Sequence, residues 1–229
     1  MGMKQILVMM AVMVLKAQSV VADEKPIADP IVEKAVREEL KKPEGELTEA
    51  DLKKVTYLYF YNTKITDAGL KEVAKLQQLR NLSLVDTQIP DEGLKDVAKL
   101  QQLTYLNLYN IQITDVGLAE LAKLQKLEEL NLFRTQITDA GLKEVAKLQK
   151  LRRLDLTGTQ VTDAGLKELA KLQKLERLCL TLTQITDEGL KDAAKLQQLK
   201  TLILLNTQIT DAGLAELKKA LPNCKIIGR

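Results

Sequence analysis

Apolar side chains return along this chain with a period of 24 residues. In the copy LEELNLFRTQITDAGLKEVAKLQK, apolar residues stand at repeat positions 1, 4, 6, 11, 16, 19 and 22. The seven copies begin at Val55, Leu79, Leu103, Leu127, Leu151, Leu175 and Leu199, and an incomplete eighth begins near Asn223. Self-similarity at a fixed period of this length is typical of solenoid proteins.

Two kinds of spacing follow each other within every copy. Positions 4 to 6 alternate as in a strand, whereas positions 16 to 22 have the spacing of a helix. A single copy cannot bury its own apolar side, so each copy depends on the next one. The pattern therefore predicts an α/β fold: a right-handed βα solenoid with a parallel sheet on its concave side and helices on its convex side.

The consensus L-x-x-L-x-L-x-x-T-x-I-T-D-x-G-L-x-x-L resembles a leucine-rich repeat. It is most similar to the cysteine-containing, F-box-associated subtype that carries I-T-D-x-G-L. That subtype usually has Cys or Asn at repeat position 9, where this chain has Thr in six copies and Ile111 in the third. The seven copies span residues 55–222. The resemblance implies a horseshoe of the ribonuclease-inhibitor type, which most often binds proteins.

The first 22 residues have the layout of a secretory signal peptide. Lys4 precedes an apolar run from Ile6 to Leu15, and small residues ending in Ala22 follow. The run is shorter than the roughly 20 apolar residues that a membrane span needs. We expect cleavage after Ala22 and a secreted or periplasmic protein without stable membrane insertion. An uncleaved anchor is the alternative.

Residues 23–54 are predicted to form a linker and a helical N-terminal cap. Asp29 and Pro30 provide an N-cap and a first helical residue, and Thr48 with Asp51 provides a capping box for a second helix. The segment IVEKAVREELKKPEGELTEADLKKVTYL resembles the cap of secreted bacterial proteins of the internalin type. That resemblance implies a bacterial exported protein.

The opposite end of the chain is predicted to close with a strand. Pro222 ends the last helix, because proline cannot continue a helix. Residues 223–229 can then add a final edge strand as a C-terminal cap. Lys225 and Arg229 would protect that edge from pairing with another chain.

Composition argues against several classes of function. The chain has no histidine, so it lacks the usual general base and the commonest metal ligand. Removal of Lys4 and Lys16 with the signal leaves 32 basic and 31 acidic residues, a net charge of +1 in place of +3. A nearly neutral protein gives no electrostatic reason to bind nucleic acid. We expect no catalytic residues, no cofactor and no metal.

The two cysteines, Cys179 and Cys224, are expected to be free thiols. They lie two strands apart, roughly 10 Å at the usual strand spacing, whereas a disulfide needs Cα atoms within about 7 Å. Cys179 stands at repeat position 5 and is predicted to point away from the core. It is either a reactive thiol or a tolerated small residue. The second interpretation is favoured because no basic neighbour promotes a thiolate.

An aspartate at position 13 and a glycine at position 15 stand in every copy. The aspartate falls in the first helical turn, where its charge interacts favourably with the helix dipole. The preceding threonine can cap the same helix, but Pro90 replaces it in the second copy. A calcium site is the weaker alternative, since calcium takes six or more oxygens. The repeated glycine indicates close backbone packing at the turn.

The variable columns of the repeat identify a candidate binding surface. Positions 3, 5 and 7 point outward onto the concave face, and they vary while the helices repeat almost unchanged. All five tyrosines fall in these columns, and tyrosine is enriched in binding surfaces. The alternative is that aromatic residues here only reflect strand propensity. The predicted partner-binding residues are Tyr57, Tyr59, Tyr61, Tyr105, Asn107, Tyr109, Asn131, Phe133, Arg153, Asp155 and Arg177.

The sequence thus predicts a non-enzymatic exported module that binds a protein partner through its concave face. The aromatic residues would act as anchors, and the arginines would set the partner's orientation. A glycan or cell-wall ligand is the second candidate, because sugars stack on tyrosine. A structural envelope protein without a discrete ligand is the third. We expect a monomer, with a dimer through the concave faces as the alternative.

Overall fold

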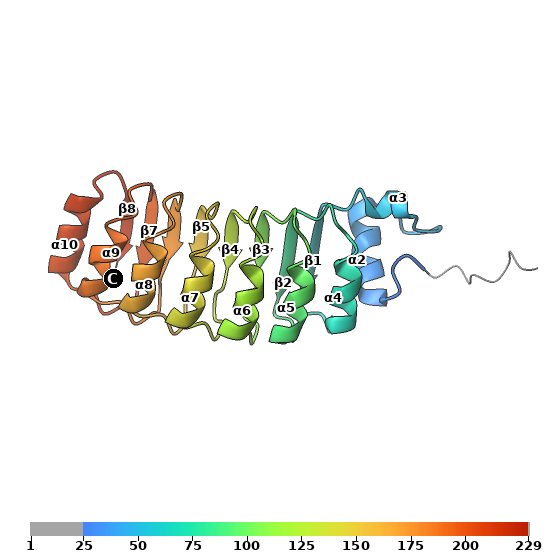
Figure 1. Ribbon diagram of the computed structural model, residues 1–229, viewed down its shortest axis with the longest axis horizontal. Coiled ribbons are helices and arrows are strands. Elements are labelled where there is room, and N and C mark those ends of the chain that lie inside the picture. Colours follow the sequence, from blue (N-terminus) through green and yellow to red (C-terminus); the bar gives the residue numbers. More distant parts are fainter. Residues whose placement is uncertain (1–24, 229) are drawn as a thin grey trace, which may run out of the picture.

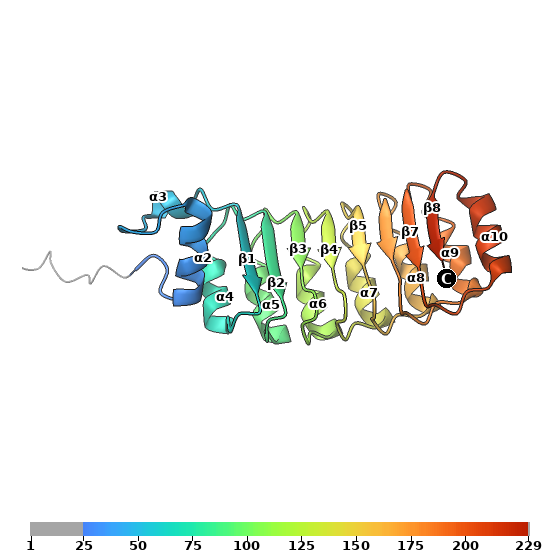
Figure 2. The ribbon, with the colours of Figure 1, turned by 180° about the vertical axis from the view of Figure 1, so that it is seen from behind.

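The computed structural model describes residues 25–228, so the predicted signal peptide and its cleavage after Ala22 lie outside the described residues. The chain forms two layers, a sheet and a row of helices behind it, extended along one axis (Figures 1 and 2). The strands are β1 (Tyr57–Tyr61), β2 (Asn81–Val85), β3 (Tyr105–Asn107), β4 (Glu129–Asn131), β5 (Arg153–Asp155), β6 (Arg177–Cys179), β7 (Thr201–Leu204) and β8 (Lys225–Gly228).

The helices alternate with the strands along the chain. They are α2 (Pro30–Leu40), α3 (Glu49–Leu52), α4 (Asp67–Val73), α5 (Leu94–Val97), α6 (Asp115–Leu121), α7 (Asp139–Val145), α8 (Asp163–Leu169), α9 (Asp187–Ala193) and α10 (Asp211–Ala220), with a short 3-10 helix, η1 (Asp91–Gly93), before α5. Within residues 25–228, no helix combines the length and the apolar character that crossing a membrane requires.

All eight strands pair in parallel, in the order in which they occur along the chain. Each strand residue pairs with the equivalent residue of the next repeat: Tyr57 pairs with Asn81, and Asn81 pairs with Tyr105. Each repeat position therefore forms a column that crosses the sheet. The predicted βα solenoid is confirmed, and the incomplete eighth copy contributes β8, which pairs with β7.

The apolar repeat positions form one continuous core between the sheet and the helices. In the fourth copy, Leu130, Leu132, Ile137 and Leu142 are each at most 2% exposed. Full burial of one such side chain contributes about 1.5–3 kcal/mol. Because these residues also pack against the copies on either side, the fold depends on contacts between neighbouring repeats.

Both helix starts of the N-terminal cap occur as predicted. The Asp29 carboxylate accepts hydrogen bonds from the N–H groups of Ile31 and Val32, and Pro30 is the first residue of α2. Thr48 and Asp51 form a reciprocal capping box at α3. Helix α2 contacts β1 and α4 and so covers the first end of the solenoid (Figure 1).

The aspartate column joins successive repeats. The Asp115 carboxylate accepts hydrogen bonds from the Thr138 backbone N–H at 2.9 Å and from the Thr138 hydroxyl at 2.6 Å. The same pair of hydrogen bonds joins Asp91 to Thr114, Asp139 to Thr162, Asp163 to Thr186 and Asp187 to Thr210. The sequence placed these aspartates only at the start of their own helices, and their link to the next repeat was missed.

The glycine column makes room for that link. A Cβ atom added to Gly141 would collide with the Asp115 carboxylate of the preceding repeat. The predicted close packing is thus against a side chain rather than against backbone. Among the described residues, no three Asp, Glu or Cys side chains are grouped so that they would hold a metal ion.

Candidate binding surface

The helices leave one face of the sheet uncovered (Figure 2), and repeat positions 3, 5 and 7 are predicted to point onto it. Strand β1 shows the alternation most clearly. Tyr57, Tyr59 and Tyr61 are 44%, 60% and 71% exposed, whereas Leu58 and Phe60 between them are 1% exposed. The outward direction predicted for these columns therefore holds on β1.

The aromatic residues of this face form two groups. The first, the tyrosine group, consists of Tyr57, Tyr59, Tyr61 and Tyr105. Within it, the Tyr57 and Tyr59 ring centroids lie 5.7 Å apart with a tilt of 58°. Tyr105 is half-buried, and this burial raises the pKa of its hydroxyl. Three of these rings thus follow one strand, and the fourth comes from β3.

The second group is a stacked pair. The rings of Tyr109 and Phe133 lie nearly parallel, at 7°, with centroids 4.4 Å apart. The Arg134 guanidinium carbon lies 5.3 Å from the Phe133 centroid, at the distance of a cation–π contact. Both rings are half-buried, so this pair is a fixed platform, whereas Tyr59 and Tyr61 are largely exposed to solvent.

The cap also contributes to this face. Glu39 on α2 lies near the Tyr57 hydroxyl, and its carboxylate raises the pKa of Tyr57. Glu39 thereby favours the protonated hydroxyl of one member of the tyrosine group. It belongs to no repeat, so a comparison of repeat columns cannot find it.

Three predicted contact residues at position 5 have a local role. Asn107, Asn131 and Asp155 each accept, through Oδ1, a hydrogen bond from the backbone N–H two residues later, at 2.9–3.0 Å. These N–H groups belong to Tyr109, Phe133 and Thr157, respectively. The oxygens are thus engaged in turning the chain after each strand, which holds Tyr109 and Phe133 in place.

The predicted arginine patch is partly neutralised. Arg153 on β5 forms an ion pair with Glu129 on β4, its register partner. Arg177 on β6 is exposed and has no acidic side chain within 4.0 Å among the described residues. Of the two predicted residues, Arg177 is therefore the cation that remains open to an external carboxylate.

The two cysteines are free thiols, as predicted. Cys179 stands at position 5 of the sheet and was predicted to point away from the core, but its side chain is buried. Burial and the negative charge of Asp155 raise the pKa of Cys179, and the nearby Arg177 acts in the opposite direction without reversing the shift. A basic neighbour is thus present but does not promote a thiolate, and the thiol is held in its less reactive, protonated form.

Repeat position 8, just after each strand, is a further shared feature that was not predicted from the sequence. All seven copies have a left-handed backbone there, with φ between 50° and 69°; the residues are Asn62, Asp86, Asn110, Arg134, Gly158, Leu182 and Asn206. Asn, Asp and Gly tolerate this conformation, whereas it costs other residues about 1–2 kcal/mol. Five Asn, Asp or Gly residues in one column were the available signal.

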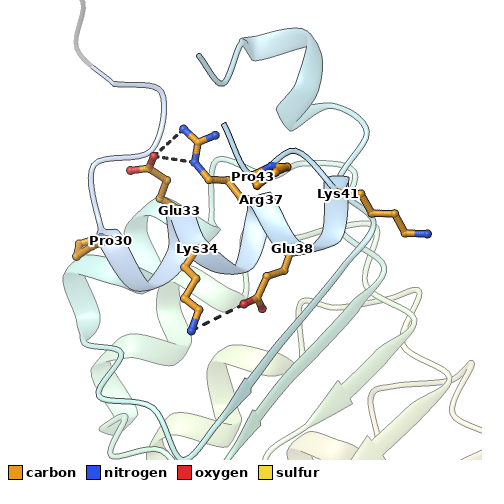
Figure 3. A pocket seen from close by; sticks show the side chains of 7 residues that line it. All are labelled: Pro30, Glu33, Lys34, Arg37, Glu38, Lys41 and Pro43. Atoms are coloured by element: carbon orange, nitrogen blue, oxygen red, sulfur yellow. Dashed lines mark hydrogen bonds and ion pairs between the residues drawn. The ribbon is translucent and has the colours of Figure 1, made fainter. Parts of the chain in front are cut away.

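A hollow on the outer side of α2 is one of several concave features near the cap (Figure 3). Four of its charged side chains pair with each other: Arg37 with Glu33 at 2.9 Å, and Lys34 with Glu38 at 3.8 Å. These groups point along the helix and do not converge on a common point. The hollow therefore has none of the features of a built site.

Comparison with known proteins places these features in context. A family profile described as "Leucine-rich repeat region" matches residues 49–214. Internalin C2 from Listeria monocytogenes is 31% identical, with a TM-score of 0.72 over 86% of this chain and 82% of that one. A leucine-rich repeat protein of Leptospira interrogans is 27% identical, with a TM-score of 0.57 over 77% of this chain and 49% of that one. No curated protein sequence matches.

Proposed function

Because the chain belongs to the leucine-rich repeat family, we propose that it is an exported, non-enzymatic module that binds a protein partner through the uncovered face of its sheet. Solenoids of this kind use such extended surfaces for binding. The observation that carries the proposal is the exposure of Tyr59 and Tyr61, at 60% and 71%, in a chain with only 3% aromatic residues.

The tyrosine group supplies the anchors in this proposal. A tyrosine buries a large area, has few rotatable bonds and keeps a polar tip, so it adds contact area at a small entropic cost. Truncation of a central anchor of this kind typically weakens binding by about 2 kcal/mol or more. Tyr57 already packs against the Tyr59 ring before any partner arrives, and this lowers the cost of ordering it.

The stacked pair extends this surface along the ends of the strands. Tyr109 and Phe133 already pack against each other, and the Asn107 and Asn131 oxygens hold the backbone beneath them. A partner would meet a rigid platform here. Rigid contact surfaces lose little freedom on binding and so favour affinity.

The proposal of export rests on the layout of residues 1–22. Expression with a C-terminal tag in a bacterial host, followed by mass measurement, tests it. The mature chain should begin at Asp23. A chain that retains Met1 in the cytoplasm would contradict export, and a Met1 form in the membrane would favour the uncleaved anchor.

Binding is tested by capture from a bacterial envelope and secretome extract. The wild-type chain is compared with a variant that carries Tyr59→Ser, Tyr61→Ser and Tyr109→Ser, and circular dichroism verifies the fold of both. A matched control carries three exposed changes on the helical side: Val116→Ser, Lys143→Ser and Lys167→Ser. A protein that the wild type and the control capture, but the tyrosine variant does not, supports the proposal. Equal capture by all three contradicts it.

A glycan is the second candidate, favoured by the freely exposed rings of Tyr59 and Tyr61. Sugar rings can stack on such side chains. Competition with soluble oligosaccharides from the same envelope separates the two candidates. Release of the captured material by oligosaccharide identifies a glycan ligand, and capture of nothing by any variant favours the structural envelope role.

A further inference from the structure

An apolar cluster lies at the opposite end of the uncovered face from the tyrosine group. Ile203 on β7 pairs in register with Cys179 on β6 and with Ile227 on β8. The Leu182 backbone N–H donates to the Leu205 carbonyl at 3.0 Å, so these two leucines lie side by side just past the same strands. We call Cys179, Leu182, Ile203, Leu205 and Ile227 the aliphatic patch.

Leu182 is the unusual member of this patch. Its backbone is left-handed, with φ of 57°, and its side chain is 52% exposed. Asn occupies the equivalent position in three other copies, at Asn62, Asn110 and Asn206. A leucine here is strained, and its side chain gains little from burial in the folded chain. Folding therefore gives no reason for leucine, and strained surface residues are candidates for function.

The charge at the border of the patch indicates what would cover it. Arg177 lies two residues before Cys179 on the same strand and lacks an acidic partner among the described residues. The neighbouring Arg153 is neutralised by Glu129, and Asp155 accepts a hydrogen bond from its own turn. The patch thus combines aliphatic surface with a cationic border, because the exposed Lys225 on β8 stands in the same register column as Arg177. Such a surface is complementary to an aliphatic side chain beside a carboxylate.

We infer that the aliphatic patch and Arg177 form a second contact region for a protein partner that offers an aliphatic side chain next to a carboxylate. This inference rests on the proposed function. The tyrosine group begins on β1 and the patch centres on β7, six strand spacings away, or about 29 Å. A helix of roughly 20 residues spans that distance. One partner that touches both regions must therefore be a long helix or a folded domain, and a short oligosaccharide reaches only one of them.

The probe for this inference is a phage-displayed library of 20-residue amphipathic helices, selected on the wild-type chain. Selected peptides are measured against Leu182→Asn, Arg177→Ala and Tyr59→Ser. Val116→Ala is the matched control, because Val116 is 73% exposed on the helical side and Ala is the residue at the equivalent position in four copies. We expect the selected sequences to pair Leu or Ile with a nearby Asp or Glu.

The expected loss of affinity is about tenfold for Leu182→Asn and about fivefold for Arg177→Ala, with no change for Val116→Ala. Leu182→Asn should at the same time raise the melting temperature, because Asn tolerates the left-handed backbone. Loss of binding in a more stable variant cannot result from unfolding. If Leu182 has no role in binding, Leu182→Asn should raise the melting temperature and leave the affinity unchanged.

The remaining outcomes separate the two proposals. Peptides that lose binding with Tyr59→Ser but not with Leu182→Asn or Arg177→Ala would overturn the inference and leave the proposed function intact. Peptides insensitive to all three substitutions would overturn both. The last measurement is analytical ultracentrifugation of the wild-type chain. A dimer that dissociates with Leu182→Asn would make the patch a contact between copies and so overturn the inference.

Discussion

Pro90 stands opposite Asp67 at the position where a threonine binds the aspartate of the preceding repeat in the next five links along the solenoid. Proline has neither a backbone N–H nor a hydroxyl, so it offers the carboxylate no donor. Asp67 Oδ1 is accordingly buried without a hydrogen-bond partner. The helix that follows Pro90 also starts differently, as the 3-10 turn η1 rather than as a complete α-helix. One substitution thus weakens the first link between repeats.

Pro90→Thr should stabilise the protein. It restores two donors to Asp67, and an unsatisfied buried oxygen costs about 1–3 kcal/mol. The loss of proline's restriction of the unfolded chain offsets roughly 0.4–1 kcal/mol of this gain. We expect a net increase of about 1 kcal/mol in the free energy of unfolding, measured with urea. Pro90→Ala, which returns only the N–H, should give a smaller gain. A less stable Pro90→Thr variant would disprove the role given to Asp67.

Gly165→Ala should destabilise the protein although alanine is the better helix former. The new Cβ would lie 2.5 Å from Asp139 Oδ1 and 2.7 Å from Leu142 Cδ1. Asp139 would have to give up its bonds to Thr162. We expect a loss of about 1–3 kcal/mol, against a gain of up to about 1 kcal/mol from helix propensity.

The matched control for this change is Ala164→Gly, one residue earlier on the exposed side of α8. It should cost about 1 kcal/mol from propensity alone. Alanine would then be preferred at position 164 and glycine at position 165. Higher stability of Gly165→Ala would mean that the Asp139–Thr162 link contributes little.

Stability should fall in acid partly through Asp187. Hydrogen bonds from the Thr210 hydroxyl and the Thr210 N–H lower the pKa of Asp187 below its usual 3.8. A group whose folded pKa is lowered stabilises the protein above its unfolded pKa, and this contribution is lost as pH falls through the folded pKa. Asp187→Asn should therefore lower the urea midpoint at pH 7 and have a much smaller effect at pH 2.

Glu188→Gln is the control, because Glu188 is exposed on the same helix and its ion pair, with Lys191, lies at the surface. Surface pairs of this kind contribute little, so this variant should resemble the wild type at both pH values. An Asp187→Asn effect that is equal at pH 7 and pH 2 would show that the carboxylate charge is not what stabilises the link.

The period of 24 residues was sufficient to predict the solenoid and the columns of its sheet. Once strand and helix spacing recur at a constant interval, identical positions must stack, and the register from Tyr57 to Asn81 to Tyr105 follows. The placement of Tyr59 and Tyr61 on the open face follows from alternation alone. The helix starts at Asp29 and Thr48 were equally readable, since capping is local chemistry.

Interactions between repeats were harder to predict, because they join residues that no local pattern relates. Asp115 and Thr138 are 23 residues apart, and a reading within one repeat assigns Asp115 to its own helix. The burial of Cys179 depends on its neighbours on adjacent strands rather than on its position in the alternation. Arg153 forms an ion pair and Arg177 does not, because only Arg153 has an acidic residue, Glu129, beside it on the neighbouring strand.

Cys179 should react slowly with iodoacetamide in the folded protein. Burial and the Asp155 charge raise the pKa of its thiol, and the thiolate is the reacting form. At pH 8 we expect alkylation at least about tenfold slower than in guanidinium chloride, followed by mass spectrometry of the peptide that contains Cys179. Asp155→Asn should speed the reaction, because it removes the negative charge and leaves Arg177 in place. A rate equal to that of the unfolded chain would show that the patch opens readily and that Cys179 is accessible.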